Sequence, residues 1–205
     1  MEPRHLPSLA LGIVALWAIG AQAAPANSLR VQVVDERGAP MRDVVVELDT
    51  AAPSAGPIRF PWRLAMAQKD LQFAPGTLIV PKGSTVAFPN LDQVRHSIYS
   101  FSKPAKFSID LYGRDQTRSQ SFPITGSVSI GCNIHDQMRG YIRVVDTPYA
   151  GKTDGNGIVT LAALPAGAAK LTVWHPALRA PKNEIVQTLA IGPGSASRKI
   201  AIRVR

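Results

Sequence analysis

The sequence predicts an all-β protein. Short runs rich in β-branched residues follow one another from residue 29 onward, and turn-forming Gly, Pro, Asn and Asp separate them. Long stretches with helical periodicity are few. The 205 residues are enough for one large or two small domains with a sizeable apolar core.

The N-terminus predicts a secretory signal peptide over residues 1–23. Arg4 precedes an apolar run at residues 9–19, and the small residues Ala21 and Ala23 follow it. The run is short for a bilayer span, and no later stretch is long and uncharged enough to be one. We therefore expect export to the periplasm and no stable membrane span after cleavage. The alternative is an uncleaved N-terminal anchor.

The central segment, residues 66–146, predicts a β-sandwich. Its candidate strands lie at residues 71–73, 77–80, 85–88, 96–99, 119–122, 127–131 and 141–145. The polar connection at residues 101–116 could carry a short helix. A Pro-rich linker over residues 50–61 marks the boundary before this segment.

Residues 24–60 and 147–205 flank the centre and look like two halves of one unit. The first half has a turn at residues 35–38 between candidate strands at 29–34 and 44–48. The second half has candidate strands at 158–161 and 170–174, each preceded by a turn, at 153–157 and 164–167. These halves resemble the carboxypeptidase-regulatory, transthyretin-like β-sandwich. The resemblance implies that the central domain is inserted into, or flanked by, this second sandwich. The alternative is one central domain with irregular extensions.

Charge and cysteine content restrict the partners and the chemistry. The net charge of +9 favours acidic partner proteins or an anionic membrane face, while the dispersed Lys and Arg do not form a nucleic-acid footprint. Cys132 is the only cysteine, so it cannot form a disulfide within its own chain in an oxidising compartment. It is then an inert buried thiol, a link between two chains, or a metal ligand.

Cys132 lies in the motif Cys132-x-x-His135-x-x-Met138, which places a thiolate, an imidazole and a thioether in one short loop. Blue copper sites use two imidazoles and a thiolate in a plane with a weak axial thioether. The second imidazole must come from elsewhere, and only His96 and His175 remain outside the signal peptide. Zinc is disfavoured, because closed zinc sites take several thiolates and no thioether. A cysteine hydrolase is disfavoured because no partner that would orient a histidine base is evident.

Residues 66–145 resemble the plastocyanin and amicyanin group of cupredoxins, which have a Greek-key β-sandwich. The matching pieces include residues 73–75, 80–83, His96 and the short ligand loop from Cys132 to Met138. The whole chain also resembles cupredoxin-like proteins labelled as methylamine utilization proteins, from which we carry over the copper site and not the pathway. The resemblance implies one type 1 copper per chain, with His96, Cys132 and His135 in the plane and Met138 axial. It further implies an electron carrier for redox partner proteins, not an enzyme.

The sequence departs from amicyanin next to the ligands. Ile134 and Asp136 stand where amicyanin has prolines, so a stiff apolar docking rim is not expected, and Ser97 stands where Asn is frequent. Asn90 and Asp92 are expected to shape the turn before His96 and to help orient its loop. A further hypothesis is that Asn90 or Asp92 contacts a copper ligand and supports it without binding the metal.

Two functions of different classes therefore remain open. One is an electron-transfer cupredoxin whose second sandwich recognises a partner; the other is a periplasmic copper carrier or partner-binding module without electron transfer. His175 is either a structural or surface histidine or part of a second metal or partner site. Trp62 and Trp174 are expected to be core or interface anchors.

Overall fold

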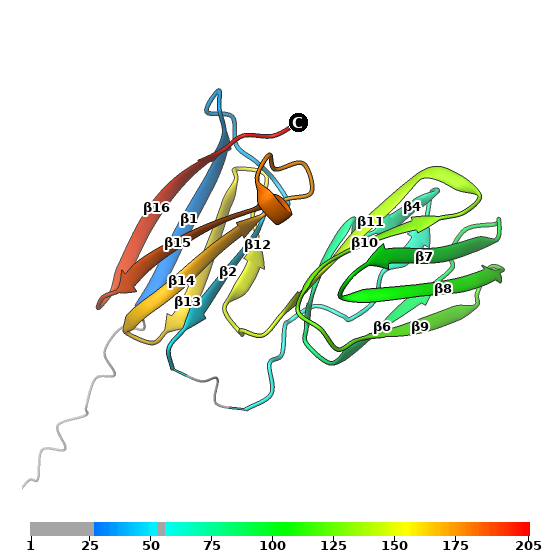
Figure 1. Cartoon of the computed structure of the whole chain (residues 1–205), viewed down its shortest axis with the longest axis horizontal. Helices are drawn as coiled ribbons and strands as arrows, with labels where there is room; N and C mark the ends of the chain where they lie inside the picture. The colour runs from blue at the N-terminus through cyan, green and yellow to red at the C-terminus, as the bar shows by residue number, and fades with distance from the viewer. Residues whose placement is uncertain (1–26, 53–55) are drawn as a thin grey trace, which may run out of the picture.

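Strands from the two ends of the chain lie in the same sheets. The computed structural model describes residues 27–52 and 56–205, and Figure 1 shows two β-sandwiches side by side. One sheet has the order β13-β1-β16, formed by β1 (Asn27–Asp35), β13 (Ile158–Leu164) and β16 (Ser195–Ile202). Its partner has the order β12-β2-β14-β15, formed by β2 (Val45–Thr50), β12 (Ala150–Lys152), β14 (Gly167–Trp174) and β15 (Glu184–Ile191). We call this pair of sheets the terminal sandwich.

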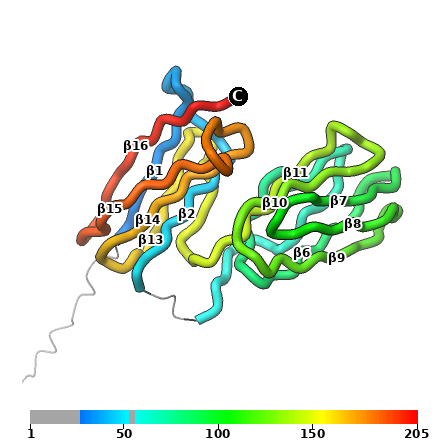
Figure 2. The backbone as a smooth tube through the Cα atoms, viewed as in Figure 1, coloured from blue at the N-terminus to red at the C-terminus, as the bar shows by residue number. Residues whose placement is uncertain are grey.

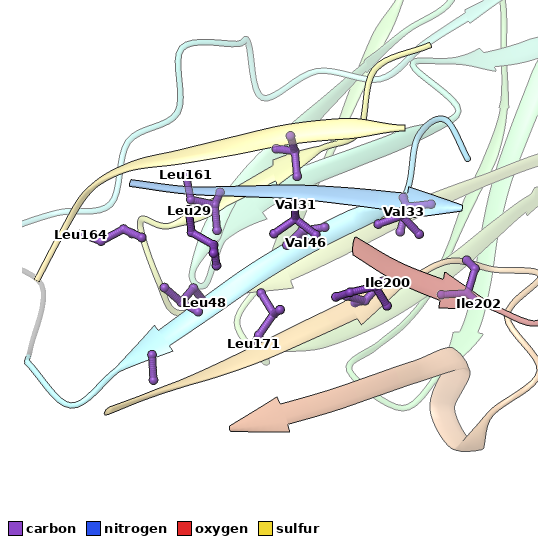
Figure 3. Close-up of a cluster of buried hydrophobic side chains, with 14 of the residues drawn as sticks. Leu29, Val31, Val33, Val46, Leu48, Leu161, Leu164, Leu171, Ile200 and Ile202 are labelled. Carbon is purple, nitrogen blue, oxygen red and sulfur yellow. The ribbon is translucent and has the colours of Figure 1, made fainter. Parts of the chain in front are cut away.

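Alternating apolar side chains build the core of the terminal sandwich. Leu29, Val31 and Val33 of β1 are buried, while Arg30 between them is exposed. Ile200 and Ile202 of β16 follow the same period of two, which is the side-chain period of a strand. Figure 3 shows these side chains directed toward those of the facing sheet. Burial of one face of each sheet therefore holds the sandwich together.

The turn at residues 154–157 needs glycine at its last position. The carboxylate of Asp154 accepts hydrogen bonds from the backbone N–H groups of Asn156 (2.9 Å) and Ile158 (2.8 Å). Gly157 has φ of +71°, and a Cβ there would lie 2.3 Å from the carbonyl oxygen of Val33. This turn thus fixes the approach of β13 to β1.

The other strands form the central sandwich, which the chain enters after β2 and leaves from β11 toward β12 (Figure 2). One sheet has the order β5-β11-β10-β7-β8, formed by β5 (Thr77–Pro81), β7 (His96–Ser102), β8 (Ala105–Tyr112), β10 (Gly126–Cys132) and β11 (His135–Val145). The facing layer holds two strand pairs, β3 (Ala67–Lys69) with β4 (Gln72–Ala74) and β6 (Ser84–Pro89) with β9 (Thr117–Phe122). Isolated bridges from Ala65 to Ala87 and from Gln68 to Asn90 join the two pairs.

The all-β prediction is confirmed. The only helical segment among the described residues is one 3-10 turn, η1 (Pro181–Asn183). The connection at residues 101–116, which could have carried a helix, instead contains β8, so that suggestion was wrong. Its half-buried Phe107 and Ile109 alternate with exposed polar residues, which is the period of a strand. The predicted signal peptide at residues 1–23 lies outside the described residues, and among those described no helix has the length and apolarity needed to cross a bilayer.

The two sandwiches meet at an apolar cluster and one buried cation. Val45 and Trp174 from the terminal sandwich pack with Ile79 and Val145 from the central one, and Phe60, Trp62 and Tyr141 lie against this cluster. Beside it, the guanidinium of Arg143 on β11 binds the carboxylates of Glu47 on β2 and Glu184 on β15, the latter at 2.6 Å. Trp62 and Trp174 are thus interface residues.

Candidate metal centre

A tight hairpin places Cys132 and His135 side by side. They are paired residues at the ends of β10 and β11, and only Asn133 and Ile134 lie between them, in the turn. Paired residues of antiparallel strands carry their side chains on the same face of the sheet. Cys132 is buried and His135 is half-buried, so the hairpin directs a thiol inward and leaves one imidazole near the surface.

The third donor comes from the first residue of β7. His96 is fully buried, and its strand neighbours β10 in the sheet. The Nδ1 atom of His96 lies 3.7 Å from the Sγ atom of Cys132 and 3.1 Å from the Nδ1 atom of His135. The Nδ1 atom of His135 is 3.6 Å from the same sulfur. Sheet pairing therefore brings together side chains 36 and 3 residues apart in the sequence.

The donor triangle has the size of a first-row metal site. A point equidistant from the three atoms would lie about 2.0 Å from each, close to the metal–nitrogen distance of about 2.0 Å and the metal–sulfur distance of about 2.3 Å for such ions. No carboxylate belongs to this cluster among the described residues. Two imidazoles and one thiolate in a plane are the donor set of blue copper centres. The residues present therefore fit a copper ion.

Met138, the predicted axial ligand, is buried on β11. It belongs to the same core cluster as Cys132 and is 1% exposed. The pairing of β10 with β11 is irregular here, because Gly131 is opposite Arg139 while the next residue, Cys132, is opposite His135. Residues 136–138 are the extra residues of a bulge, a feature that redirects side chains.

A carboxylate orients His96. The Nε2 atom of His96 is 2.8 Å from the Oδ2 atom of Asp92, while Nδ1 faces the thiol. The same carboxylate accepts hydrogen bonds from the backbone N–H groups of Asp70 (2.6 Å) and Leu71 (3.1 Å). Partial burial would raise the pKa of Asp92, but the hydrogen bonds from His96, Leu71 and Asp70 outweigh it and lower that pKa. An ionised Asp92 holds the proton of His96 on Nε2 and leaves the Nδ1 lone pair for a metal.

Asn90 fixes the loop that carries Asp92. Its side-chain amide donates to the carbonyl oxygens of Val94 (2.9 Å) and Tyr112 (3.1 Å), and its Oδ1 accepts the backbone N–H of Asp92 (2.9 Å). Asn90 is fully buried. The turn-shaping expected of this residue is therefore present as three hydrogen bonds.

Ser97 links the two loops of the site. Its hydroxyl oxygen accepts the backbone N–H of Asn133 at 3.1 Å and lies 3.9 Å from the sulfur of Cys132. Ser97 is buried. From the sequence, Ser97 was noted only because Asn is frequent at this position. Its hydrogen bond to the hairpin turn could not be predicted from local sequence, because the two partners are 36 residues apart.

The surface beside His135 carries exposed apolar side chains among polar ones. Ile134 is 52% exposed and lines a shallow hollow of about 390 Å³ with Leu111 and Ser97. Further exposed apolar side chains lie in the two segments that the Asp92 hydrogen bonds connect. They are Leu71 in one segment, and Leu91 and Val94 in the other, and they are 44–50% exposed. The absence of a stiff apolar docking rim around His135 stays a prediction.

His175 lies outside this cluster, in the segment after β14. Its Nδ1 accepts the backbone N–H of Ala177 at 3.3 Å, and its own backbone N–H bonds Asn183. Burial lowers the pKa of His175, with Asp43 opposing the effect. Among the described residues, no group of three His, Cys, Asp or Glu donors includes it.

The chain is similar to solved copper-protein structures over part of its length. One is the copper-containing nitrite reductase of Thermus scotoductus, at 26% identity over 47% of this chain and 26% of that one, with a TM-score of 0.40. A purple cupredoxin of Nitrosopumilus maritimus is 22% identical over 40% of this chain and 98% of that one, with a TM-score of 0.36. A reduced amicyanin variant is 19% identical over 49% of this chain and 98% of that one, with a TM-score of 0.38. The chain thus spans about a quarter of the reductase. No family model and no curated protein matches it.

Proposed function

We propose that this protein is an exported type 1 copper protein that carries single electrons between redox partners. The observation that carries the proposal is the triangle formed by Cys132, His96 and His135, whose donor atoms converge at 3.1–3.7 Å. These three residues would hold one copper ion, with Met138 as the proposed fourth ligand. The copper would supply reversible one-electron chemistry.

The way the donors are held supports electron transfer. His96 is fixed by Asp92, and Cys132 and His135 are fixed by strand pairing. Donors that are already in place have little to rearrange when the charge of the site changes. His96 and Cys132 are buried, so His135 is the proposed route by which electrons leave. Ile134, which is exposed and precedes His135, would provide an apolar contact for a partner.

The proposed location is the periplasm, and the proposed partners are redox proteins with acidic surfaces. The residue pattern of the N-terminus supports export, and the net charge of +9 favours acidic partners.

Copper titration tests the proposal. Addition of one equivalent of Cu(II) to the full chain should produce an intense thiolate-to-copper absorption band near ~600 nm. Cys132→Ser should abolish that band, whereas Ser129→Ala, an exposed change on the same strand, should leave it intact. A colourless protein after copper addition would contradict the proposal.

Redox cycling separates an electron carrier from a copper store. A carrier should be reduced and reoxidised by small redox agents repeatedly while one copper stays bound. Loss of copper on reduction would instead indicate carriage or storage.

A further inference from the structure

A second candidate site lies between the two sandwiches. A cleft of about 1070 Å³ lies between the outer face of the β2-β14-β15 sheet and the strands β10 and β11. This volume is at the upper end of the range for small-molecule sites, about 300–1,000 Å³. None of the proposed copper ligands lines it.

The acidic side chains of the cleft are already paired. Asp49 lies 2.8 Å from the ammonium of Lys170, and Asp146 lies 3.1 Å from that of Lys82. Glu47 and Glu184 both bind Arg143. The carboxylates that line the cleft therefore have cationic partners within the protein.

The cations at its margins are not paired in this way. Lys103 lies in the turn between β7 and β8 of the central sandwich, and Lys182 lies in η1 of the terminal one; both are exposed. Neither ammonium lies within 4.0 Å of a carboxylate of the described residues, and the same holds for the Arg205 guanidinium. Positive charge thus faces the cleft from both sandwiches.

Two hydroxyl groups that line the cleft have donor hydrogens that no bond among the described residues uses. Trp174 lies on the same lining, and its indole N–H is buried without a hydrogen-bond partner among the described residues. The Ser127 hydroxyl accepts a bond from Arg143 (2.8 Å), and the Ser102 hydroxyl accepts one from the Ser129 backbone (2.9 Å). Each hydroxyl keeps its own hydrogen free to donate. A ligand that satisfies these groups must bring acceptor oxygens.

We propose that this cleft binds a small oligoanion, a molecule with two or more phosphate or carboxylate groups, held between Lys103 and Lys182 with the Ser102 and Ser127 hydroxyls as donors and Trp174 beside it. Such a ligand contacts both sandwiches and stabilises their arrangement. The site works without copper, so it stands independently of the electron-transfer function.

Titration of the metal-free full chain with tripolyphosphate, and separately with citrate, tests this site at constant ionic strength. The indole N–H signal of Trp174 should shift in a ¹⁵N–¹H correlation spectrum. The Trp62 indole is the internal control, because it is bonded to the carbonyl of Ile79 at 2.9 Å and should not shift. A response to tripolyphosphate alone assigns phosphate groups, and a response to citrate alone assigns carboxylates.

Charge removal supplies the matched comparison. The double variant Lys103→Gln/Lys182→Gln should weaken binding about tenfold, as expected for the loss of two exposed charge-assisted contacts. Arg198→Gln/Lys199→Gln removes two exposed charges from β16, in the other sheet of the terminal sandwich, and should not change binding. An unshifted Trp174 signal with both anions, or equal weakening by Arg198→Gln/Lys199→Gln, would overturn the proposal.

Discussion

The carboxylate of Asp92 determines which nitrogen of His96 faces the thiol. It binds Nε2 at 2.8 Å and so directs the Nδ1 lone pair toward Cys132. Loss of such a carboxylate behind a ligand typically costs 10–100-fold in metal affinity. We expect Asp92→Asn to weaken copper binding by about 10–100-fold, measured by competition with a chelator.

Asp110→Asn is the matched control for this change. Asp110 is exposed on β8 and lines the hollow beside Ser97, so its loss removes the same charge close to the site. No hydrogen bond joins its side chain to a proposed ligand in the described part of the chain. Equal losses of affinity in the two variants would contradict the orienting role of Asp92.

His175 should make stability depend on pH. Burial lowers its pKa below the ordinary 6.5, although Asp43 opposes this. The stabilisation is complete above the unfolded pKa and is lost as the pH falls through the lowered folded pKa. His175→Asn keeps an acceptor for Ala177, so urea unfolding from about pH 7 to pH 5 should show a smaller loss of stability in the variant than in the parent. Parallel stability curves would contradict this.

At the residue scale, the ligands that lie close together in the sequence could be predicted. The hydrogen bonds between residues distant in the sequence could not. Cys132, His135 and Met138 stand three residues apart, so one short motif predicts them together. His96 followed from the need for a second imidazole. The bonds of Asp92 to Asp70 and Leu71 depend on a hairpin more than 20 residues away, which no local pattern encodes.

At the scale of single strands, the close packing of β10 against β7 requires glycine next to Cys132. A Cβ on Gly131 would lie 2.8 Å from the ring of Tyr99, its partner on β7. We expect Gly131→Ala to lower the free energy of unfolding by about 1–3 kcal/mol through overpacking, measured by urea denaturation of the metal-free protein. Gly113→Ala should cost less, because nothing lies within 4 Å of the added methyl group. Tyr99→Ala should rescue part of the loss; without rescue, the steric explanation fails.

Sequence reasoning missed β3, β8, β12, β15 and β16. β8 was passed over because exposed Lys106, Ser108 and Asp110 dominate its composition. β15 and β16 were not identified, although Ile200 and Ile202 show the period of a strand. β3 and β12 have three residues each, which is too short for a periodic signal.

For the whole molecule, Arg143 is the buried ionic connection between the sandwiches. It is buried among Glu47 and Glu184, and removal of one partner from a buried ion pair typically costs about 3–5 kcal/mol. Burial raises the pKa of Glu47, although Arg143 opposes this, so the carboxylates depend on the guanidinium. We expect Arg143→Met to lower the unfolding free energy by about 3–5 kcal/mol and to split one calorimetric transition into two.

Arg139→Met is the control on the same strand, because Arg139 is exposed. It should leave the transition single and close to the parent temperature. A single, unshifted transition in Arg143→Met would show that the sandwiches stay joined without the Arg143 ion pairs. The Arg143 contacts to Glu47 and Glu184 span 96 and 41 residues, so the sequence alone does not predict them.

The pairing of β1 with β16 dictates an order of events during synthesis. Ser28 lies opposite Ser195 in a parallel pair, so β1 cannot pair with β16 until residues 195–202 have been made. Contacts so distant in sequence form slowly, because a long loop must close first. The central sandwich, which is contiguous from β3 to β11, can assemble earlier. The donor triangle is therefore completed by a part of the chain that need not wait for the last strand.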